Sequence, residues 1–226
     1  MDQWVIPPGH DAEFVSRMEP VLDEYERPFD PDRPSVNIDE ASVQLIEETR
    51  TPIPAAPGQP ARVDYEYKRN GTANLFVAFQ PLLGWREVVV TDRRTAADFA
   101  GFLKHLADDI YAEAEKITLV LDNLNTHSPA SLYQAFEPAE AHRLAGRFEW
   151  VYTPKHGSWL NMAEIEFAAL RKQCLRRRLG TMVELRAEVE AWQNARNDRE
   201  VVANWQFRTA DARVKLRHLY PQPQAT

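Results

Sequence analysis

The chain has 226 residues, 44% hydrophobic and 27% charged, which is ordinary for a globular protein with one substantial domain. It contains no apolar run of about 18 residues that could span a membrane, and its single cysteine, Cys174, excludes an internal disulfide and a cysteine-cluster zinc site. The net charge of −7 argues against a nucleic-acid partner, but residues 151–226 carry 13 Lys and Arg against 8 Asp and Glu, whereas residues 1–150 carry 14 against 26.

Strand and helix patterns alternate along the first half. Apolar side chains at helical spacing predict a helix over 11–26, and the proline-rich stretch after it ends that helix. A first strand is expected at 35–45, followed by a long polar connection rich in proline. Strands at 72–82 and 85–92, separated by a short Leu-Gly turn, predict a hairpin, and 95–111 predicts an amphipathic helix.

The second half begins with KITLVLDN, a continuous apolar run of the kind buried on both faces of a sheet. Two short helices are expected at 129–136 and 138–147, followed by a fifth strand at 148–154. Three C-terminal helices are expected at 158–179, at 181–197 and within the tail. This order predicts an α/β fold with a mixed five-stranded sheet whose first three strands are antiparallel. We divide the chain into a lead-in helix and linker (1–34), a main domain (35–180) and a helical extension packed on it (181–226).

Asp39 lies inside the first predicted strand, in the sequence VNIDEA. Alternation along the strand puts Asn37, Asp39 and Ala41 on one face. A carboxylate in mid-strand is uncommon, because burying it without a partner costs free energy. Two interpretations stay open: a functional carboxylate, or an edge strand whose polar face meets water.

Asp122 ends the apolar run ITLVL and is followed by Asn123, Asn125 and His127. Ligands and catalytic groups gather at the carboxyl ends of strands in α/β sheets. An Asp at a strand end can also cap a turn. The cluster of one Asp, two Asn and one His within six residues favours the functional interpretation.

Glu164 lies early in the helix predicted at 158–179. At 100° per residue it borders an apolar stripe that includes Cys174, so we expect it where the buried face of the helix meets an opening. Glu166 points to nearly the opposite face and is expected in solvent. A helical Glu is by default a surface charge, so the interpretation of Glu164 depends on the other two acids.

Together, the three carboxylates indicate a metal site. Brought close, they cannot all stay ionised unless cations compensate them. Oxygen ligands select Mg²⁺ or Mn²⁺ rather than zinc. Two such ions can activate a water or 3′-hydroxyl nucleophile and stabilise the leaving oxygen in an in-line displacement at phosphorus.

Three sequence blocks, VNIDEASVQL, ITLVLDNLNTH and YTPKHGSWLNMAEIE, resemble in order the motif blocks of bacterial insertion-sequence transposases of the mariner superfamily, and the resemblance covers nearly the whole chain. It implies a ribonuclease H-like (integrase-like) fold and cut-and-paste movement of DNA that is flanked by terminal inverted repeats. It also implies a D-D-E triad, with Asp39, Asp122 and Glu164 as catalytic residues and as ligands of Mg²⁺ or Mn²⁺, two ions when DNA is bound.

The resemblance extends to residues around the triad. Asn123 and His127 match positions beside the second acid and are expected to orient it or to contact the scissile phosphate. Further candidates for support of the acids or for DNA contact are Asn37, Lys155, His156, Ser158 and Asn161.

The partners implied are double-stranded DNA with terminal inverted repeats and a second copy of the chain in the synaptic complex. A transposase of this type also carries a helix-turn-helix region that recognises the repeat, and the residues before Asp39 are too few for it. We therefore expect that region upstream or in trans, from a truncated, split or frameshifted gene. The first residues, MDQWVIPPGHDAEF, lack a secretory signal, so a cytoplasmic, nucleoid-associated bacterial protein is expected.

The densest basic stretch, RKQCLRRR, is most simply a solvated helix face. Arg171 and Arg178, however, lie seven and fourteen residues after Glu164 and would stay on its side of one helix, which favours phosphate contact. Trp159, Trp192 and Trp205 are expected in the core, and Cys174 is expected to be buried and inert.

Two alternatives remain beside a strand-transfer enzyme. One is a nuclease of the same fold without a preference for transposon ends. The other is an inactive relic that acts only as a module binding DNA or a full-length transposase.

Overall fold

The computed structural model describes residues 6–7, 9, 11–51, 53–62 and 64–221. Their strands form one five-stranded sheet in the order β3-β2-β1-β4-β5, with bounds β1 Ser35–Glu48, β2 Tyr67–Gln80, β3 Trp85–Thr91, β4 Ile117–Leu121 and β5 Phe148–Tyr152. β1, β2 and β3 are antiparallel neighbours, whereas β4 runs parallel to both β1 and β5. The predicted mixed sheet and its antiparallel half are confirmed.

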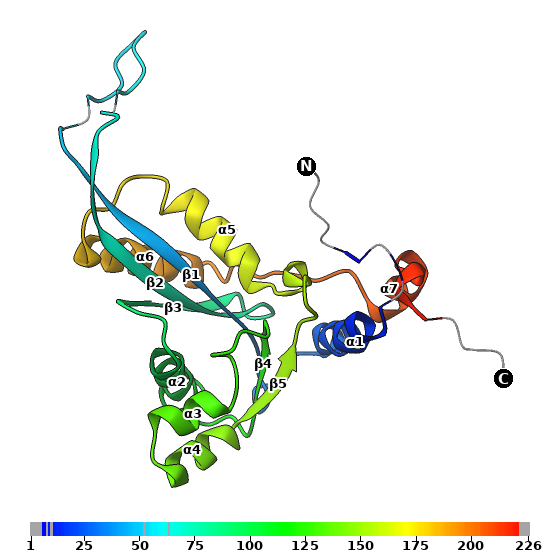
Figure 1. Cartoon of the computed structure of the whole chain (residues 1–226). Coiled ribbons are helices and arrows are strands. Elements are labelled where there is room, and N and C mark those ends of the chain that lie inside the picture. Colours follow the sequence, from blue (N-terminus) through cyan, green and yellow to red (C-terminus); the bar gives the residue numbers. More distant parts are fainter. Residues whose placement is uncertain (1–5, 8, 10, 52, 63, 222–226) are drawn as a thin grey trace, which may run out of the picture.

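Helices cover both faces of this sheet (Figure 1). Their bounds are α1 Ala12–Glu26, α2 Ala96–His105, the π-helix η1 Leu106–Ile110, α3 Ala130–Ala135, α4 Pro138–Ala145, the 3₁₀ helix η2 Ser158–Leu160, α5 Ala163–Gln173, α6 Met182–Asn197, α7 Thr209–Lys215 and the 3₁₀ helix η3 Arg217–Leu219. α2, α3 and α4 lie on one side, α5 and α6 on the other, and α1 and α7 lie together beside β5 (Figure 1). The described helices therefore complete a layered α/β fold.

The alternation of β1 divides its side chains between two apolar cores. Val36 and Ile38 are buried with α2 and α3, whereas Ala41 and Leu45 are buried with α5 and α6. A third cluster joins α1 to α7 and to β4 and includes Val120. β1 is thus a central strand, so the edge-strand interpretation of Asp39 is wrong.

Two elements differ from their predicted bounds. β1 and β2 continue three and five residues beyond the predicted strand ends, to Glu48 and back to Tyr67, and form a two-stranded ribbon that projects from the sheet (Figure 1). The helix predicted at 158–179 is instead η2 followed by α5, which ends at Gln173. Beyond the end of α5, Arg177 pairs with Glu188 of α6, and Arg178 pairs with Glu48 of β1.

The turn between β2 and β3 fixes the C-terminal segment on the sheet. Gly84 has φ +63°, and a Cβ there would lie 2.4 Å from the backbone carbon of Glu200. Only glycine permits this approach without displacement of the backbone. Segment 198–205 is therefore closely packed against the β2–β3 turn.

Within the described chain, no helix combines the length and the apolar character needed to cross a bilayer. Residues 1–5, on which the prediction about a secretory signal partly depends, lie outside the described residues. The division at residues 34 and 180 stays a prediction, although α6 packs on β3 and α1 contacts α7.

Candidate active site

Asp39 and Asp122 lie on neighbouring parallel strands. The ladder between β1 and β4 pairs Asn37 with Val120. Continuing that register by two residues brings Asp39 beside Asp122, at the point where β4 has just ended. Since adjacent strands lie about 5 Å apart, the two carboxylates share one edge and one face of the sheet.

Glu164 approaches the same place from α5. It lies in the first turn of that helix and is exposed, while Ala163 before it is fully buried. The charges of Glu164 and Asp122 both raise the pKa of Asp39, so the two acids lie in its neighbourhood. The assignment of the three acids as catalytic residues stays a prediction.

The electrostatics of Asp39 reflect the negative charge around it. Burial raises the pKa of Asp39 to about 7, and the charges of Glu164 and Asp122 add to that rise, whereas the backbone N–H of Glu40 and the nearby His127 oppose it. Within the described chain, no Lys or Arg forms an ion pair with any of the three acids. The site is one that a cation would stabilise.

The residues present fit a divalent cation in chemistry. They offer only carboxylate oxygens, which are the ligands that Mg²⁺ and Mn²⁺ prefer. No three His, Cys, Asp or Glu side chains of the described residues are yet arranged so that they could hold a metal ion. The donors are therefore suitable, but they do not by themselves form a finished coordination site.

His127 contacts Asp122 just beyond the end of β4. Its Nδ1 lies 2.5 Å from Oδ1 of Asp122, and its ring is fully buried against Phe99, with ring centroids 4.6 Å apart. Desolvation alone would lower the pKa of His127, but its contacts with Asp122 and Glu40 outweigh that and raise it to about 9. The contact with the buried imidazole restricts the orientation of the Asp122 carboxylate.

Glu40 completes this arrangement and was missed in the sequence. Its side chain is only 5% exposed, with Oε2 3.6 Å from Nε2 of His127 and Oε1 3.0 Å from Nη1 of Arg94. The signal was available, because Glu40 follows Asp39 on the strand and so points to the opposite, apolar face with Ile38. A charged residue on that face requires a buried partner.

Two asparagines clamp the strand that carries Asp39 to the helix that carries Glu164. Nδ2 of Asn161 donates to the carbonyl of Ile38 at 2.8 Å, and Oδ1 of Asn37 accepts from the backbone N–H of Met162 at 3.1 Å. The hydroxyl of Tyr25 on α1 donates to Oδ1 of Asn37 at 2.5 Å and also lies 2.6 Å from the carbonyl of Leu160. Both asparagines are buried, so they support the site and do not reach DNA directly.

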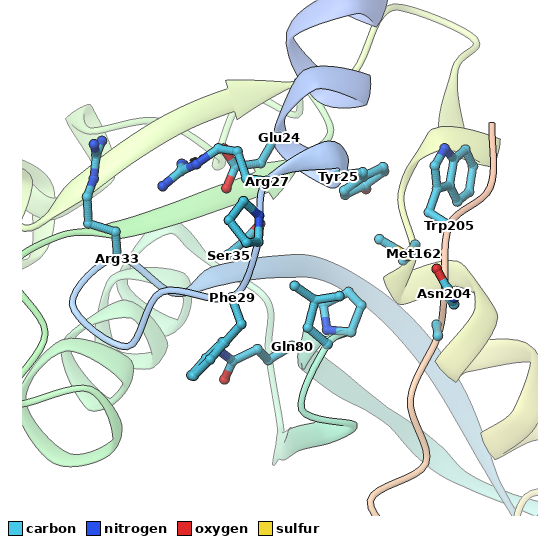
Figure 2. Close-up of a pocket in the computed structure, with 14 residues that line it drawn as sticks. Glu24, Tyr25, Arg27, Phe29, Arg33, Ser35, Gln80, Met162, Asn204 and Trp205 are labelled. Carbon is cyan, nitrogen blue, oxygen red and sulfur yellow. Dashed lines mark hydrogen bonds and ion pairs between the residues drawn. The ribbon is translucent and has the colours of Figure 1, made fainter. Parts of the chain in front are cut away.

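A small cavity adjoins this clamp at the start of β1 (Figure 2). Tyr25, Trp205 and Met162 line it together with Glu24, whose Oε1 has no hydrogen-bond partner among the described residues. Its volume of about 40 Å³ has room for a water molecule but not for a nucleotide. The carboxylate edge therefore remains the candidate for chemistry.

Comparison with known proteins agrees with this geometry. The family described as DDE superfamily endonuclease matches residues 34–186, which include all three acids. The chain belongs to this family.

Solved structures of the Mos1 mariner transposase share its fold. The Mos1 strand transfer complex superposes with a TM-score of 0.57 at 16% identity, over 89% of this chain and 61% of the Mos1 chain. The Mos1 paired-end complex with Mn gives 0.56 at 16% identity, over 89% and 62%. The DDE domain thus has the predicted ribonuclease H-like fold and spans about 62% of the length of Mos1. No curated protein matches the chain.

The remaining candidates of the DDE domain lie on its surface. Asn123, Lys155, His156 and Ser158 are exposed. His156 has φ +63°, and a Cβ at Gly157 would lie 2.6 Å from a ring carbon of Pro154, so the turn is tightly constrained. Lys155 and His156 border a pocket that is also lined by Phe14 of α1.

The single basic track predicted along one helix is not formed. Arg171 is exposed on α5, but Arg178 lies beyond the helix end, where it pairs with Glu48 at 2.6 Å and stacks on Tyr67. Cys174 is buried, as predicted. Trp192 is buried, whereas Trp159 and Trp205 are half-buried and stack on each other.

The prediction for Glu166 was wrong. It is 1% exposed and forms ion pairs with Arg86 of β3 and Arg196 of α6. Helical geometry did turn it away from Glu164, but α6 and β3 cover that side of α5, which the local pattern of one helix could not reveal.

Proposed function

We propose that this chain is the catalytic domain of a DNA transposase, which cleaves DNA strands at transposon ends and joins them to a target. Asp39, Asp122 and Glu164 are the catalytic residues in this proposal. The observation that carries it is the negative charge at the edge where β1, β4 and α5 meet, where no Lys or Arg of the described residues pairs with the three acids. It is supported by membership of the DDE endonuclease family and by the shared fold with Mos1, whose solved complexes include one with Mn and one with Mg.

Mg²⁺ or Mn²⁺, two ions when DNA is bound, would supply Lewis-acid activation of the attacking and leaving oxygens. The chain's own residues then have three tasks. Asp39 on β1 and Asp122 after β4 present carboxylate oxygens on adjacent strands, and Glu164 closes the site from α5. His127 fixes the direction of the Asp122 carboxylate, while the Asn37–Asn161 clamp fixes the distance between β1 and α5.

DNA contacts in this proposal come from the exposed groups around the acids. Lys155, His156 and Ser158 lie on the constrained turn before α5, Arg171 lies on α5, and Asn123 follows Asp122. Their donors suit phosphate oxygens, which position a duplex without reading its sequence. Recognition of the inverted repeats is assigned to a helix-turn-helix region supplied upstream or in trans, and synapsis of two ends to two copies of the chain.

The test is Mn²⁺-dependent cleavage and joining of a terminal-repeat duplex by wild type, Asp122→Ala and Asp92→Asn. Asp92 is an exposed acid whose side chain has no hydrogen bond or ion pair with the described residues, so it serves as the matched control. We expect Asp122→Ala to lose at least about 1,000-fold in rate, or about 4 kcal/mol of transition-state stabilisation, and Asp92→Asn to match wild type. Equal rates for wild type and Asp122→Ala would refute the assigned site.

A further inference from the structure

The first two turns of α5 carry two glutamates with opposite surroundings. Glu164 is exposed at the carboxylate edge, whereas Glu166, two residues later, is buried between α5, β3 and α6. Two residues correspond to a rotation of about 200° around a helix. The two side chains are therefore fixed to one rigid element but point in nearly opposite directions.

Both oxygens of Glu166 are held by arginine. Oε1 accepts from Nη2 of Arg196 at 2.8 Å, and Oε2 accepts from Nε of Arg196 at 3.1 Å. Nε of Arg86 lies 2.9 Å from the same Oε2, and the Arg86 side chain is fully buried. Because arginines contact the Glu166 carboxylate from two directions, a rotation of this carboxylate would break at least one of these contacts.

The arginines are themselves fixed to other elements. The Arg86 guanidinium donates to Oδ1 of Asn197 at 3.1 Å and to the carbonyl of Val201 at 2.6 Å, and it lies over the ring of Phe79. The side chain of Asn197 also exchanges hydrogen bonds of 2.9 Å with the backbone N–H and carbonyl of Arg86. The end of α6 is thereby joined to β3, and Glu166 joins α5 to both.

Stability alone does not account for this cluster. Apolar side chains of similar volume commonly stabilise a fold as well as a buried ion cluster does. Apolar packing restrains a helix without directional bonds, whereas the two hydrogen bonds from Arg196 to Glu166 favour one rotation of α5. A rotation of about 10° would move a carboxylate about 6 Å from the helix axis by about 1 Å, and a displacement of that size can cost about 100-fold in rate.

We propose that the Arg86–Glu166–Arg196 cluster is a positioning device, which sets the rotation of α5 and thereby the place of the Glu164 carboxylate relative to Asp39 and Asp122. This rests on the proposed function of those three acids. Arg196 lies outside residues 34–186, the part that matches the family. The C-terminal segment thus contributes to the geometry of the site although none of its side chains lies in it.

The test uses Arg196→Met and Arg196→Lys, because both keep the buried pair of Arg86 with Glu166. Met fills a similar volume but makes no ion pair. Lys keeps the positive charge but cannot form both hydrogen bonds that Arg196 donates to Glu166. Arg143→Met is the control, since Arg143 also binds two carboxylates, Asp108 and Glu140, on the far helical layer. Three quantities are measured: Mn²⁺ affinity by electron paramagnetic resonance, DNA affinity, and single-turnover cleavage rate.

We expect Arg196→Met to weaken Mn²⁺ binding and to slow cleavage by about 10-fold to 100-fold each, the usual cost of losing a group that orients metal ligands. DNA affinity should be unchanged, Arg196→Lys should recover part of both losses, and Arg143→Met should match wild type. If Arg196→Met lowers only the thermal midpoint, with Mn²⁺ affinity and cleavage rate at wild-type values, the positioning role is refuted.

A triple variant with Arg86→Met, Glu166→Leu and Arg196→Met separates positioning from simple structural support. If it folds and cleaves at the wild-type rate, apolar packing suffices and the inference fails. Failure of the proposed function would look different. In that case Asp122→Ala and Glu164→Gln would bind Mn²⁺ as tightly as wild type, whereas failure of the inference alone leaves those two variants defective and the Arg196 variants normal.

Discussion

The carboxylate edge and the buried ion cluster differ in how the fold treats negative charge. At the edge, Asp39, Asp122 and Glu164 have no arginine or lysine partner among the described residues, and only His127 contacts Asp122; burial and the other two acids raise the pKa of Asp39 to about 7. In the cluster, a single carboxylate, Glu166, has two arginines. The chain therefore pairs Glu166 fully, whereas it compensates the acids at the edge only in part.

The contrast separates an acid that is paired within the fold from acids that are not. Burying an acid with its partners favours one arrangement of helices, whereas acids that lie together without full partners destabilise the fold in the absence of a cation. Substitutions in the two regions should consequently change stability in opposite directions. The predictions below test that opposition, beginning with the largest effect.

Removing the charge of Glu166 should cause the largest loss of stability. Glu166→Gln leaves the buried Arg86 and the partly buried Arg196 without a carboxylate, so we expect the free energy of unfolding to fall by about 3–5 kcal/mol. Urea denaturation followed by circular dichroism measures it. Glu164→Gln is the matched control on the same helix and should change stability by less than about 0.5 kcal/mol because Glu164 is exposed. Similar losses for both variants would contradict the comparison.

The second largest loss of stability is expected at the Asn37–Asn161 clamp, which carries no charge. Asn161→Ala removes the hydrogen bond to the carbonyl of Ile38 and the one from the backbone N–H of Ala163, both buried. Leaving these groups without partners should cost about 2–3 kcal/mol of unfolding free energy. Asn123→Ala, at an exposed position, should leave the free energy of unfolding unchanged. An equal loss in both variants would show that the hydrogen bonds of the clamp do not contribute more to stability than an exposed asparagine does.

The sequence was informative wherever a local pattern determines structure. The helix predicted at 181–197 is confirmed, and Thr181 and Glu184 form a capping box at its start. The apolar run before Asp122 correctly indicated a strand buried on both faces. The parallel pairing of β1 with β4, which brings Asp39 beside Asp122, came from the structure.

The misses differ in cause. Glu166 was expected in solvent because its partners, on β3 and α6, are distant in the chain. The helix was extended to residue 179, whereas α5 ends at Gln173 and Arg178 pairs with Glu48 of β1. Glu40 was overlooked although strand alternation already placed it on the apolar face, and its partner His127 lies 87 positions later in the chain.

Neutralising an acid at the carboxylate edge should raise stability. Asp39→Asn removes a charge whose burial and acidic neighbours disfavour it, so without metal at pH 7.5 we expect the free energy of unfolding to rise by about 1–2 kcal/mol. The same variant should lose Mn²⁺-dependent cleavage. The measurement is denaturation in EDTA, with Asp92→Asn as control. A loss of stability would mean that Asp39 is already compensated and that the contrast between the regions is false.

The smallest effect should come from the ion network on the far helical layer, where Arg143 and Lys104 bind Asp108 and Glu140. Hydrogen bonds from Arg143 lead the causes that lower the pKa of Asp108 to about 2. Because this folded-state pKa is depressed, its contribution is present above about pH 4 and disappears as the pH falls towards 2. The groups are largely solvated, so Arg143→Met should cost less than about 1 kcal/mol at pH 7.

The difference between Arg143→Met and wild type should therefore shrink between pH 4 and pH 2, as measured by urea denaturation at each pH. A buried cluster should behave differently, since Glu166→Gln removes a partner that water cannot replace. If Arg143→Met proved as destabilising as Glu166→Gln at pH 7, burial would not be what separates the two networks, and the number of paired charges alone would explain both.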